Sequence, residues 1–437
     1  MSKVHVSQQS QSERSIEQTS ASSSALPDIN AETYPFEIVQ HLLNQAAYFN
    51  MYSTPNPDYP NTAIHAPGNA NGVIGIRVHE ILHRFDISVQ PSTPDNPLRA
   101  YNTVGAPAAT FDHRWMLIPH AFSALPDRAP PSTLFDMSHS QRFVMLDGVC
   151  KFGNGQDGFY GFGTGLTYPV TVQGRRELLA ASIGTIMEGF GKFQDLEGTY
   201  TYGGTLCADR GFQGNLVCRV MDPEGTLRSE RELPPVKPMS ESEPGITYII
   251  LHGEKRDKTA KTTYSFGLDG QVNGLIVEQQ LRLFHLNFAS QGRGGLRSVE
   301  CIGQVIGKMT SKILFNLFNP GAPGTATAPI PFSAYNELTF FDRNGQILGG
   351  FVGDGGEGRT FNMTLANAPG QQALRFGGVG PLRHGTGCFR GIEGLMTDNS
   401  VVGVAPHVTS TLYVLRINDP DGQYRAGFSG KTQQQAT

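Results

Sequence analysis

The chain has 437 residues, a formal net charge of −4 and only 16% charged residues, a balance that argues against an electrostatic surface for nucleic acid or an anionic membrane. Five cysteines without a C-x-x-C pair argue against a disulfide framework or a zinc finger. No apolar run approaches the roughly 18 residues of a membrane-spanning helix, and the N-terminus lacks a signal-peptide pattern. We therefore expect a soluble, cytoplasmic protein.

The N-terminal part of the chain divides into two segments. Residues 1–33 are rich in serine and glutamine and almost free of large apolar side chains, so we expect a disordered tail. The stretch PFEIVQHLLNQAAYFNMY (35–52) has apolar residues at helical spacing, which predicts a short helix. This helix and a connecting segment would occupy residues 34–69.

Beyond this point, short β-like runs alternate with Gly, Pro, Asn and Asp, and the runs repeat. GFGKFQDLEG (189–198) returns 196 residues later (385 − 189) as GTGCFRGIEG. RVMDPEGTLR (219–228) returns 197 residues later (416 − 219) as RINDPDGQYR. Matches in the same order with nearly the same offset predict a duplicated β domain.

We place the first copy at residues 70–230 and the second copy, with a polar C-terminal tail, at residues 246–437. The segment 231–245 between them is rich in proline and charge and predicts a linker. Short strands whose edges must be hidden favour a closed antiparallel β-barrel for each copy, although a β-sandwich fits the pattern nearly as well. The stretch GLIVEQQLRLFHLNF (274–288) is either the first strand of the second copy or a helix.

The stretch HEILH, which begins at His79, fits the H-E-x-x-H pattern, in which two histidines bind zinc and the glutamate activates water. That site requires a helix, where positions i and i+4 share a face. Here the flanking sequence is dense in β-branched residues, and Phe85, Ile87 and Val89 alternate as in a strand. In a strand, His79 and His83 would lie about 13 Å apart, too far to share one ion. We predict a strand without a metal site, and a zinc hydrolase is the least favoured alternative.

On such a strand, Val78, Glu80 and Leu82 share one face, which places a carboxyl group among apolar side chains. Inside a barrel, burial would raise the pKa of Glu80 and suit it to proton transfer or to the stabilisation of a developing cation. The alternatives are an ion pair with Arg77 or Arg84, or an exposed position.

The stretch GLTYPVTVQGRRELLAASIGTIMEGFGKFQDLEGTYTYGGTL (165–206) resembles the central strands of allene oxide cyclase and the related dirigent proteins. In those families an L-T-Y strand precedes a G-x-G-x-F-x-x-x-x-G turn and another strand. VHEILHRFD (78–86) is similar to the first strand of allene oxide cyclase, where V-Y-E-I precedes a charged stretch. The resemblance implies two tandem barrels of this type, a role for Glu80 in ring closure, and an active-site tyrosine at Tyr168. Leu82 stands where the family has an asparagine, so the resemblance does not extend to that position.

Other residues are candidates for the lining of a pocket or for structural roles. Tyr200 and Tyr202 share a face and predict pocket-lining side chains, and His120 is a further candidate for substrate binding. Arg219 and Arg416 recur before D-P-[ED]-G in both copies, which favours a role in the turns over catalysis.

These observations predict a cofactor-independent cyclase or isomerase that shapes a hydrophobic, polyunsaturated or polyketide-like small molecule. The alternative is a non-catalytic, dirigent-like ligand-binding protein. Apart from the small molecule we expect neither nucleic acid nor membrane as a partner, and self-association into a homo-oligomer stays open. We expect the chemistry in the first barrel and a mainly structural second barrel, because Phe361 replaces Tyr168 there and Glu278 is only a provisional counterpart of Glu80.

Overall fold

The computed structural model of the chain describes most of its residues, and these are almost entirely β-strand. The described ranges are 45–90, 98–117, 141–172, 175–207, 211–240, 242–255, 262–266, 272–290, 295–315, 330–364, 372–403 and 409–426. Their helical content is one 3-10 turn, η2 (Gly191–Phe193). Within these ranges, no helix is long and apolar enough to pass through a lipid bilayer.

The first barrel is an antiparallel sheet in the order β1-β9-β8-β7-β6-β5-β4-β3-β2. A further pairing of β1 with β3 closes eight of the strands into a barrel and leaves β2 as an extension along β3. The strands are β1 (Ala46–Pro55), β2 (Thr62–Ala66), β3 (Asn69–Gln90), β4 (Arg99–Leu117), β5 (Gln141–Phe152), β6 (Asp157–Val172), β7 (Arg175–Phe190), β8 (Gly198–Cys207) and β9 (Gly211–Met221).

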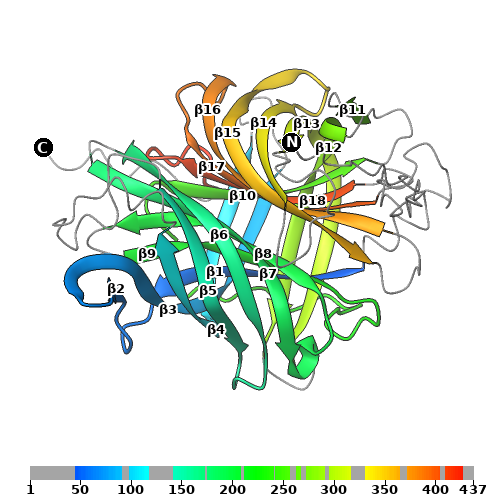
Figure 1. Cartoon of the computed structure of the whole chain (residues 1–437). Helices are drawn as coiled ribbons and strands as arrows, with labels where there is room; N and C mark the ends of the chain where they lie inside the picture. The colour runs from blue at the N-terminus through cyan, green and yellow to red at the C-terminus, as the bar shows by residue number, and fades with distance from the viewer. Residues whose placement is uncertain are drawn as a thin grey trace, which may run out of the picture.

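The second barrel repeats this arrangement strand for strand. Its order is β10-β18-β17-β16-β15-β14-β13-β12-β11, and β10 pairs with β12 to close it. The strands are β10 (Ile246–Lys255), β11 (Thr262–Phe266), β12 (Val272–Ala289), β13 (Arg297–Phe315), β14 (Ile330–Phe341), β15 (Ile347–Thr364), β16 (Gln372–Gly387), β17 (Gly394–Gly403) and β18 (Thr409–Asn418). The predicted all-β class, the duplication and the closed barrels are confirmed (Figure 1).

The predicted N-terminal helix is wrong where the structure describes it. Residues 46–52 lie in β1, which pairs with both β3 and β9 and closes the first barrel. The first barrel therefore begins at Ala46 and not at residue 70, while residues 35–44 of the predicted helix lie outside the described ranges. The stretch 274–288, left open between strand and helix, lies in strand β12, the counterpart of β3.

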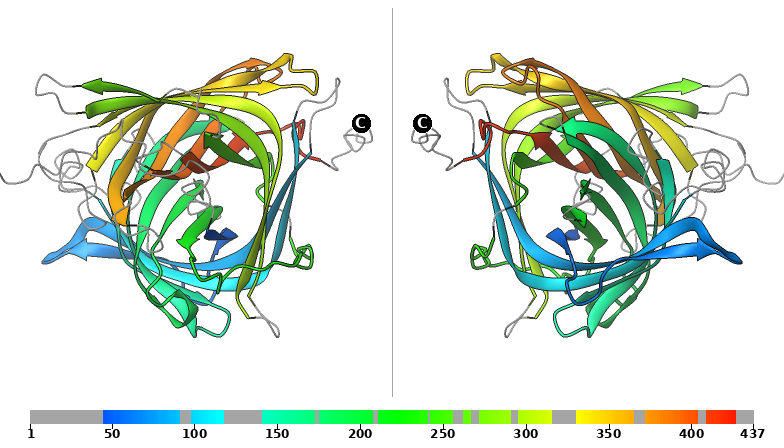
Figure 2. Two further views of the ribbon diagram at one scale, coloured as in Figure 1. Left: turned by 90° about the vertical axis from the view of Figure 1, so that its right-hand side faces the viewer. Right: turned by 90° about the vertical axis from the view of Figure 1, so that its left-hand side faces the viewer.

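The two barrels pack against each other through equivalent elements. Strand β3 contacts β12, β8 contacts β17, and β7 contacts β16, so each strand meets its own counterpart. Contacts of this kind define a pseudo-two-fold relationship between the barrels. In Figure 2 the blue-to-green strands of the first barrel and the green-to-red strands of the second form curved walls.

The repeated D-P-x-G turns link the barrels reciprocally. After β9, Leu227 accepts a hydrogen bond from the backbone N–H of Ser298 in the second barrel, at 2.8 Å. After β18, Tyr424 accepts the equivalent bond from Ala100 in the first barrel, also at 2.8 Å. Arg219 donates from Nη1 to the carbonyl oxygen of Ser410 at 2.7 Å, across the interface. These contacts give the repeated motifs a structural role.

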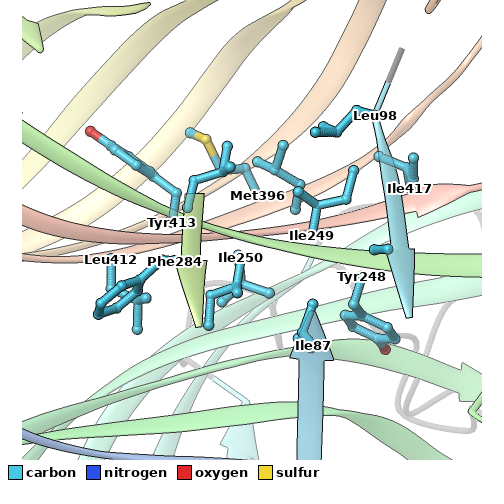
Figure 3. Close-up of a cluster of buried hydrophobic side chains, with 14 of the residues drawn as sticks. Ile87, Leu98, Tyr248, Ile249, Ile250, Phe284, Met396, Leu412, Tyr413 and Ile417 are labelled. Carbon is cyan, nitrogen blue, oxygen red and sulfur yellow. The ribbon is translucent and has the colours of Figure 1, made fainter. Parts of the chain in front are cut away.

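A large apolar cluster runs through strands β10 and β18 and joins the second barrel to the interface (Figure 3). Tyr413 and Met396 lie on one side of these strands, and Leu412 and Ile250 lie on the other. The strands are thus buried on both faces, one toward the interior of the second barrel and one toward the first barrel.

Candidate functional site

The HEILH stretch lies on strand β3, as predicted, and Glu80 points into the first barrel. Val78 and Leu82 belong to the apolar cluster of that interior and are fully buried, and Glu80 between them is only 1% exposed. The predicted inward face of Val78, Glu80 and Leu82 is therefore confirmed. An exposed Glu80 is excluded, and its polar contacts are with Ser53 and His113 and with neither Arg77 nor Arg84.

Glu80 has one short hydrogen bond and one nearby imidazole. Ser53 on β1 donates from Oγ to Oε1 of Glu80 at 2.5 Å. Nδ1 of His113 on β4 lies 3.8 Å from the other carboxylate oxygen, Oε2. His113 reaches this place because it is the cross-strand partner of Val78, so its side chain shares the inward face with Glu80.

Burial shifts the pKa values of Glu80 and His113 in opposite directions. Burial raises the pKa of Glu80 to about 8, with the hydrogen bond from Ser53 acting against it. Burial lowers the pKa of His113 to about 3. Near neutral pH the interior thus holds a protonated carboxylic acid beside a neutral imidazole, a proton donor and a proton acceptor without net charge.

Around this pair the structure gathers buried polar atoms that lack a hydrogen-bond partner. Within the described ranges these are both ring nitrogens of His113, Nε1 of Trp115 and the hydroxyl groups of Ser182 and Tyr202. Ser53 lies near the Tyr202 hydroxyl and acts to lower its pKa, but the two do not form a hydrogen bond of normal geometry. Ser182 and Tyr202 are cross-strand partners on β7 and β8. Since buried polar groups in proteins are nearly always paired, these donors and acceptors are available to a polar ligand or to water.

Aromatic side chains enclose the polar cluster. Trp115 stacks on Phe143 with ring centroids 4.2 Å apart, and Phe111 lies 4.6 Å from the His113 ring. Tyr200 packs edge-on against Phe111 at 5.6 Å. Tyr200 and Tyr202 both point inward, as predicted, and both are buried. The wall is therefore apolar, with its polar atoms confined to one region.

The two histidines of HEILH each contact another side chain. They lie on the opposite face of β3 from Glu80, where Nδ1 of His79 contacts Asp112 at 2.6 Å and Nε2 of His83 contacts the hydroxyl of Thr54 at 3.0 Å. Nowhere in the described part of the chain do three or more His, Cys, Asp or Glu side chains converge as metal ligands.

Tyr168 is not brought together with Glu80. On β6, Gly165 faces the ring of Phe143 inside the barrel, so Tyr168, three residues on, faces outward. It packs in a cluster that includes Val379 and Leu395 of the second barrel. Tyr168 is therefore an interface residue here, which corrects its predicted pairing with Glu80. The predicted substrate-binding residue His120 lies outside the described ranges.

His113 is the site residue that the sequence analysis missed. Its signal is the alternation FDHRW, which places Phe111, His113 and Trp115 on one face of a strand. Recognising that this face meets Glu80 requires the pairing of β3 with β4, which local periodicity does not supply.

The second barrel has different residues at the equivalent positions. Ser53 pairs with Leu82 in the first barrel and Gly253 pairs with Leu281 in the second, so the counterpart of Glu80 is Gln279. Glu278, the provisional counterpart, is exposed on the outer face of β12, and that assignment is wrong by one residue. The partner of Val277 is Ser311, which takes the place of His113.

Comparison with known proteins identifies no relative: no family model, no curated protein and no solved structure matches the chain. The geometry of the barrel interior is therefore the basis for its function.

Proposed function

We propose that the first barrel is a cofactor-independent isomerase or cyclase for an apolar, oxygen-bearing small molecule of the polyunsaturated or polyketide-like class. The supporting observation is the neutral pair of Glu80 and His113 at 3.8 Å, placed among unpartnered polar atoms inside an aromatic wall.

This pair suits a proton shift within one substrate. Protonated Glu80 gives its proton to one substrate atom, and neutral His113 removes a proton from another, so the substrate keeps its composition. The carboxylate and the imidazolium that result attract each other across 3.8 Å, and one bridging water relays the proton from His113 to Glu80, which restores both groups. No oxidant, reductant or second substrate is needed.

The donors that surround the pair suit an oxygen atom on the substrate. The N–H of Trp115 and the hydroxyls of Ser182 and Tyr202 are unpartnered within the described ranges and could bind a carbonyl, hydroxyl or ether oxygen. A partner for such groups is worth more in a buried site than in water. The aromatic wall would hold the hydrocarbon part in one folded conformer, which favours ring closure by restricting motion.

The resemblance of residues 165–206 and 78–86 to allene oxide cyclase supports the same reaction class, with Glu80 as its common element. Two positions differ, because Leu82 replaces an asparagine and Tyr168 lies at the interface. We therefore place the second proton-transfer group at His113, on the geometry of this chain.

The test uses deuterium exchange, because an isomerisation leaves the mass of its substrate unchanged. Purified full-length protein is incubated in D2O with an apolar extract of the cells that naturally make it, and mass spectrometry follows pairs of isomers. Wild type should convert one isomer into the other with incorporation of deuterium. Glu80→Gln and His113→Ser should each lower the rate by about 100-fold or more.

The second barrel supplies the matched control. Ser311→Ala changes the counterpart of His113 and should leave the conversion intact. Full activity of Glu80→Gln would refute the proposal. A molecule that binds unchanged to wild type and to both variants would instead identify a non-catalytic, dirigent-like binding protein.

A further inference from the structure

The interior of the second barrel contains a carboxyl group at a position where the first barrel has none. A row of cross-strand partners runs from Phe332 through Gly358 and Gly378 to Asp398 and Tyr413, on strands β14 to β18. Directly paired residues share a face, and Tyr413 lies in the interior, so the whole row points inward.

The corresponding row of the first barrel holds Phe143, Gly165, Ser182 and Tyr202. Asp398 therefore stands where the first barrel has Tyr202. The two interiors share their architecture and differ in their chemistry.

Asp398 lies deep in the protein and still keeps accessible surface. The residue keeps part of its accessible surface, whereas Met396 and Ser400 on the same inward face are buried. This remaining surface is open to contact with a small molecule.

The carboxyl group has little to compensate its charge. Ser400 donates from Oγ to Oδ2 at 3.2 Å, and no lysine, arginine or histidine of the described ranges forms an ion pair with it. Burial raises the pKa of Asp398 to about 6, which leaves it largely ionised above neutral pH. A buried carboxylate without a cation is costly, and a bound cation would remove that cost.

A second polar atom on the same inward face lacks a partner. Thr360 on β15 is two residues after Gly358 and therefore also faces inward. It lies in a row of cross-strand partners that leads through Phe376 to Ser400. It is 3% exposed, and its hydroxyl has no hydrogen-bond partner within the described ranges. In contrast, Gln279 is fully paired, because it donates to Thr409 and Thr411 and accepts from Tyr413.

We propose that the second barrel binds a small organic ammonium ion, with Asp398 as its counter-charge and the hydroxyls of Thr360 and Ser400 as further hydrogen-bond acceptors. This site is separate from the one at Glu80. It replaces the expectation from the sequence that the second barrel is mainly structural.

The surroundings favour an organic cation over a metal ion. A single carboxylate with two hydroxyls falls short of the six or more oxygen ligands that calcium or magnesium requires. The same face carries Phe332, Met396 and the ring of Tyr413, which provide apolar contacts for a hydrocarbon group. A protonated amine on a short apolar chain satisfies both parts of this lining.

Titration calorimetry on the full-length protein tests this directly, with methylammonium, butylammonium and benzylammonium chloride as probes and methanol, 1-butanol and benzyl alcohol as their neutral matches. At least one ammonium probe should bind, and its neutral match should bind at least tenfold more weakly. Asp398→Asn should weaken the ammonium complex at least tenfold and Thr360→Val several-fold. Glu80→Gln, in the other barrel, should bind as wild type does.

A second measurement needs no variant. Within the described ranges, Tyr413 is the one ionisable group that faces Asp398 from a neighbouring strand. Burial raises the pKa of its phenol far above the pH range of the experiment. The affinity of wild type for the ammonium probe should therefore fall as the pH drops through about 6, where Asp398 becomes protonated. No binding of any probe, equal binding of the neutral match, or full affinity in Asp398→Asn would overturn the proposal.

Discussion

Gln279 in the second barrel takes the strand position that Glu80 occupies in the first. Both side chains point inward and both are buried, at 5% and 1% exposed. Gln279 donates to Thr409 at 2.8 Å and to Thr411 at 2.9 Å, so an amide is fully accommodated at this place in the fold. Glutamine is also the nearest match in shape to a protonated glutamate, which makes Glu80→Gln a substitution that this barrel architecture tolerates.

The first prediction concerns the pH dependence of stability in Glu80→Gln. Burial raises the pKa of Glu80 from 4.5 to about 8, so the folded state binds the proton more tightly than the unfolded state. The stability from this group is fully present below pH 4.5 and is lost as the pH rises through 8. Relative to wild type, the free energy of unfolding of the variant should rise by roughly 3–4 kcal/mol between pH 5 and pH 8. Urea titrations at the two pH values measure this, and parallel curves for both proteins would contradict it.

The second prediction concerns His113→Ser and has the opposite sign. Burial lowers the pKa of His113 from 6.5 to about 3, so the unfolded state binds the proton more tightly. Wild type should lose roughly 2 kcal/mol from this residue between pH 7 and pH 5, and the variant should not. Each protein is compared with itself at the two pH values, which removes the constant cost of the smaller side chain. An equal acid loss in both would show that His113 is accessible to protons when folded.

The third prediction concerns the buried ion pair at the interface. Nε of Arg416 donates to Oε2 of Glu243 at 3.1 Å, and Tyr248 donates to the same oxygen at 2.9 Å. Arg416→Met leaves the carboxylate buried without its cation and should cost roughly 3–5 kcal/mol. The double variant with Glu243→Gln should recover part of that loss. Arg390→Met at an exposed position is the control and should change stability by less than about 0.5 kcal/mol.

The fourth prediction uses a pair of equivalent glycines. A Cβ on Gly184 would lie 1.8 Å from Cζ of the Tyr200 ring, inside the aromatic wall. Gly380 is its counterpart, paired with Met396, and there the nearest atom would be Cα of Gly356 at 3.0 Å. Gly184→Ala should lower the unfolding free energy by about 2 kcal/mol or more, and Gly380→Ala by clearly less. Thermal melting of both variants decides this, and equal losses would indicate that the Tyr200 ring is free to move aside.

Local periodicity was enough to predict that Glu80 faces an interior. Residues 78–82 alternate on a strand whose inward positions are apolar, and this pattern does not depend on distant contacts. The repeat was equally direct, because matched turns recur at a nearly constant offset. His113 was missed because its place beside Glu80 follows from the pairing of β3 with β4.

The predicted helix and the predicted placement of Tyr168 beside Glu80 differ from the structure for one shared reason. In β1, Phe49 and Met51 face the barrel interior, whereas Tyr48 and Tyr52 face the second barrel. A strand buried on both faces loses its alternation and can imitate a helical pattern. Tyr168 likewise lies on a strand with two covered faces, so its residue type does not reveal which face is the interior.

Nε2 of His285 lies 2.8 Å from Oδ1 of Asp86 across the interface, and these two residues hold equivalent positions in β12 and β3. In a dimer of identical chains, a residue near the symmetry axis meets its own copy, so aspartate would face aspartate and histidine would face histidine. One polypeptide that carries both halves escapes this constraint. Each half can mutate alone, opposite charges can then meet at the axis, and the two interiors are equally free to acquire unlike chemistry.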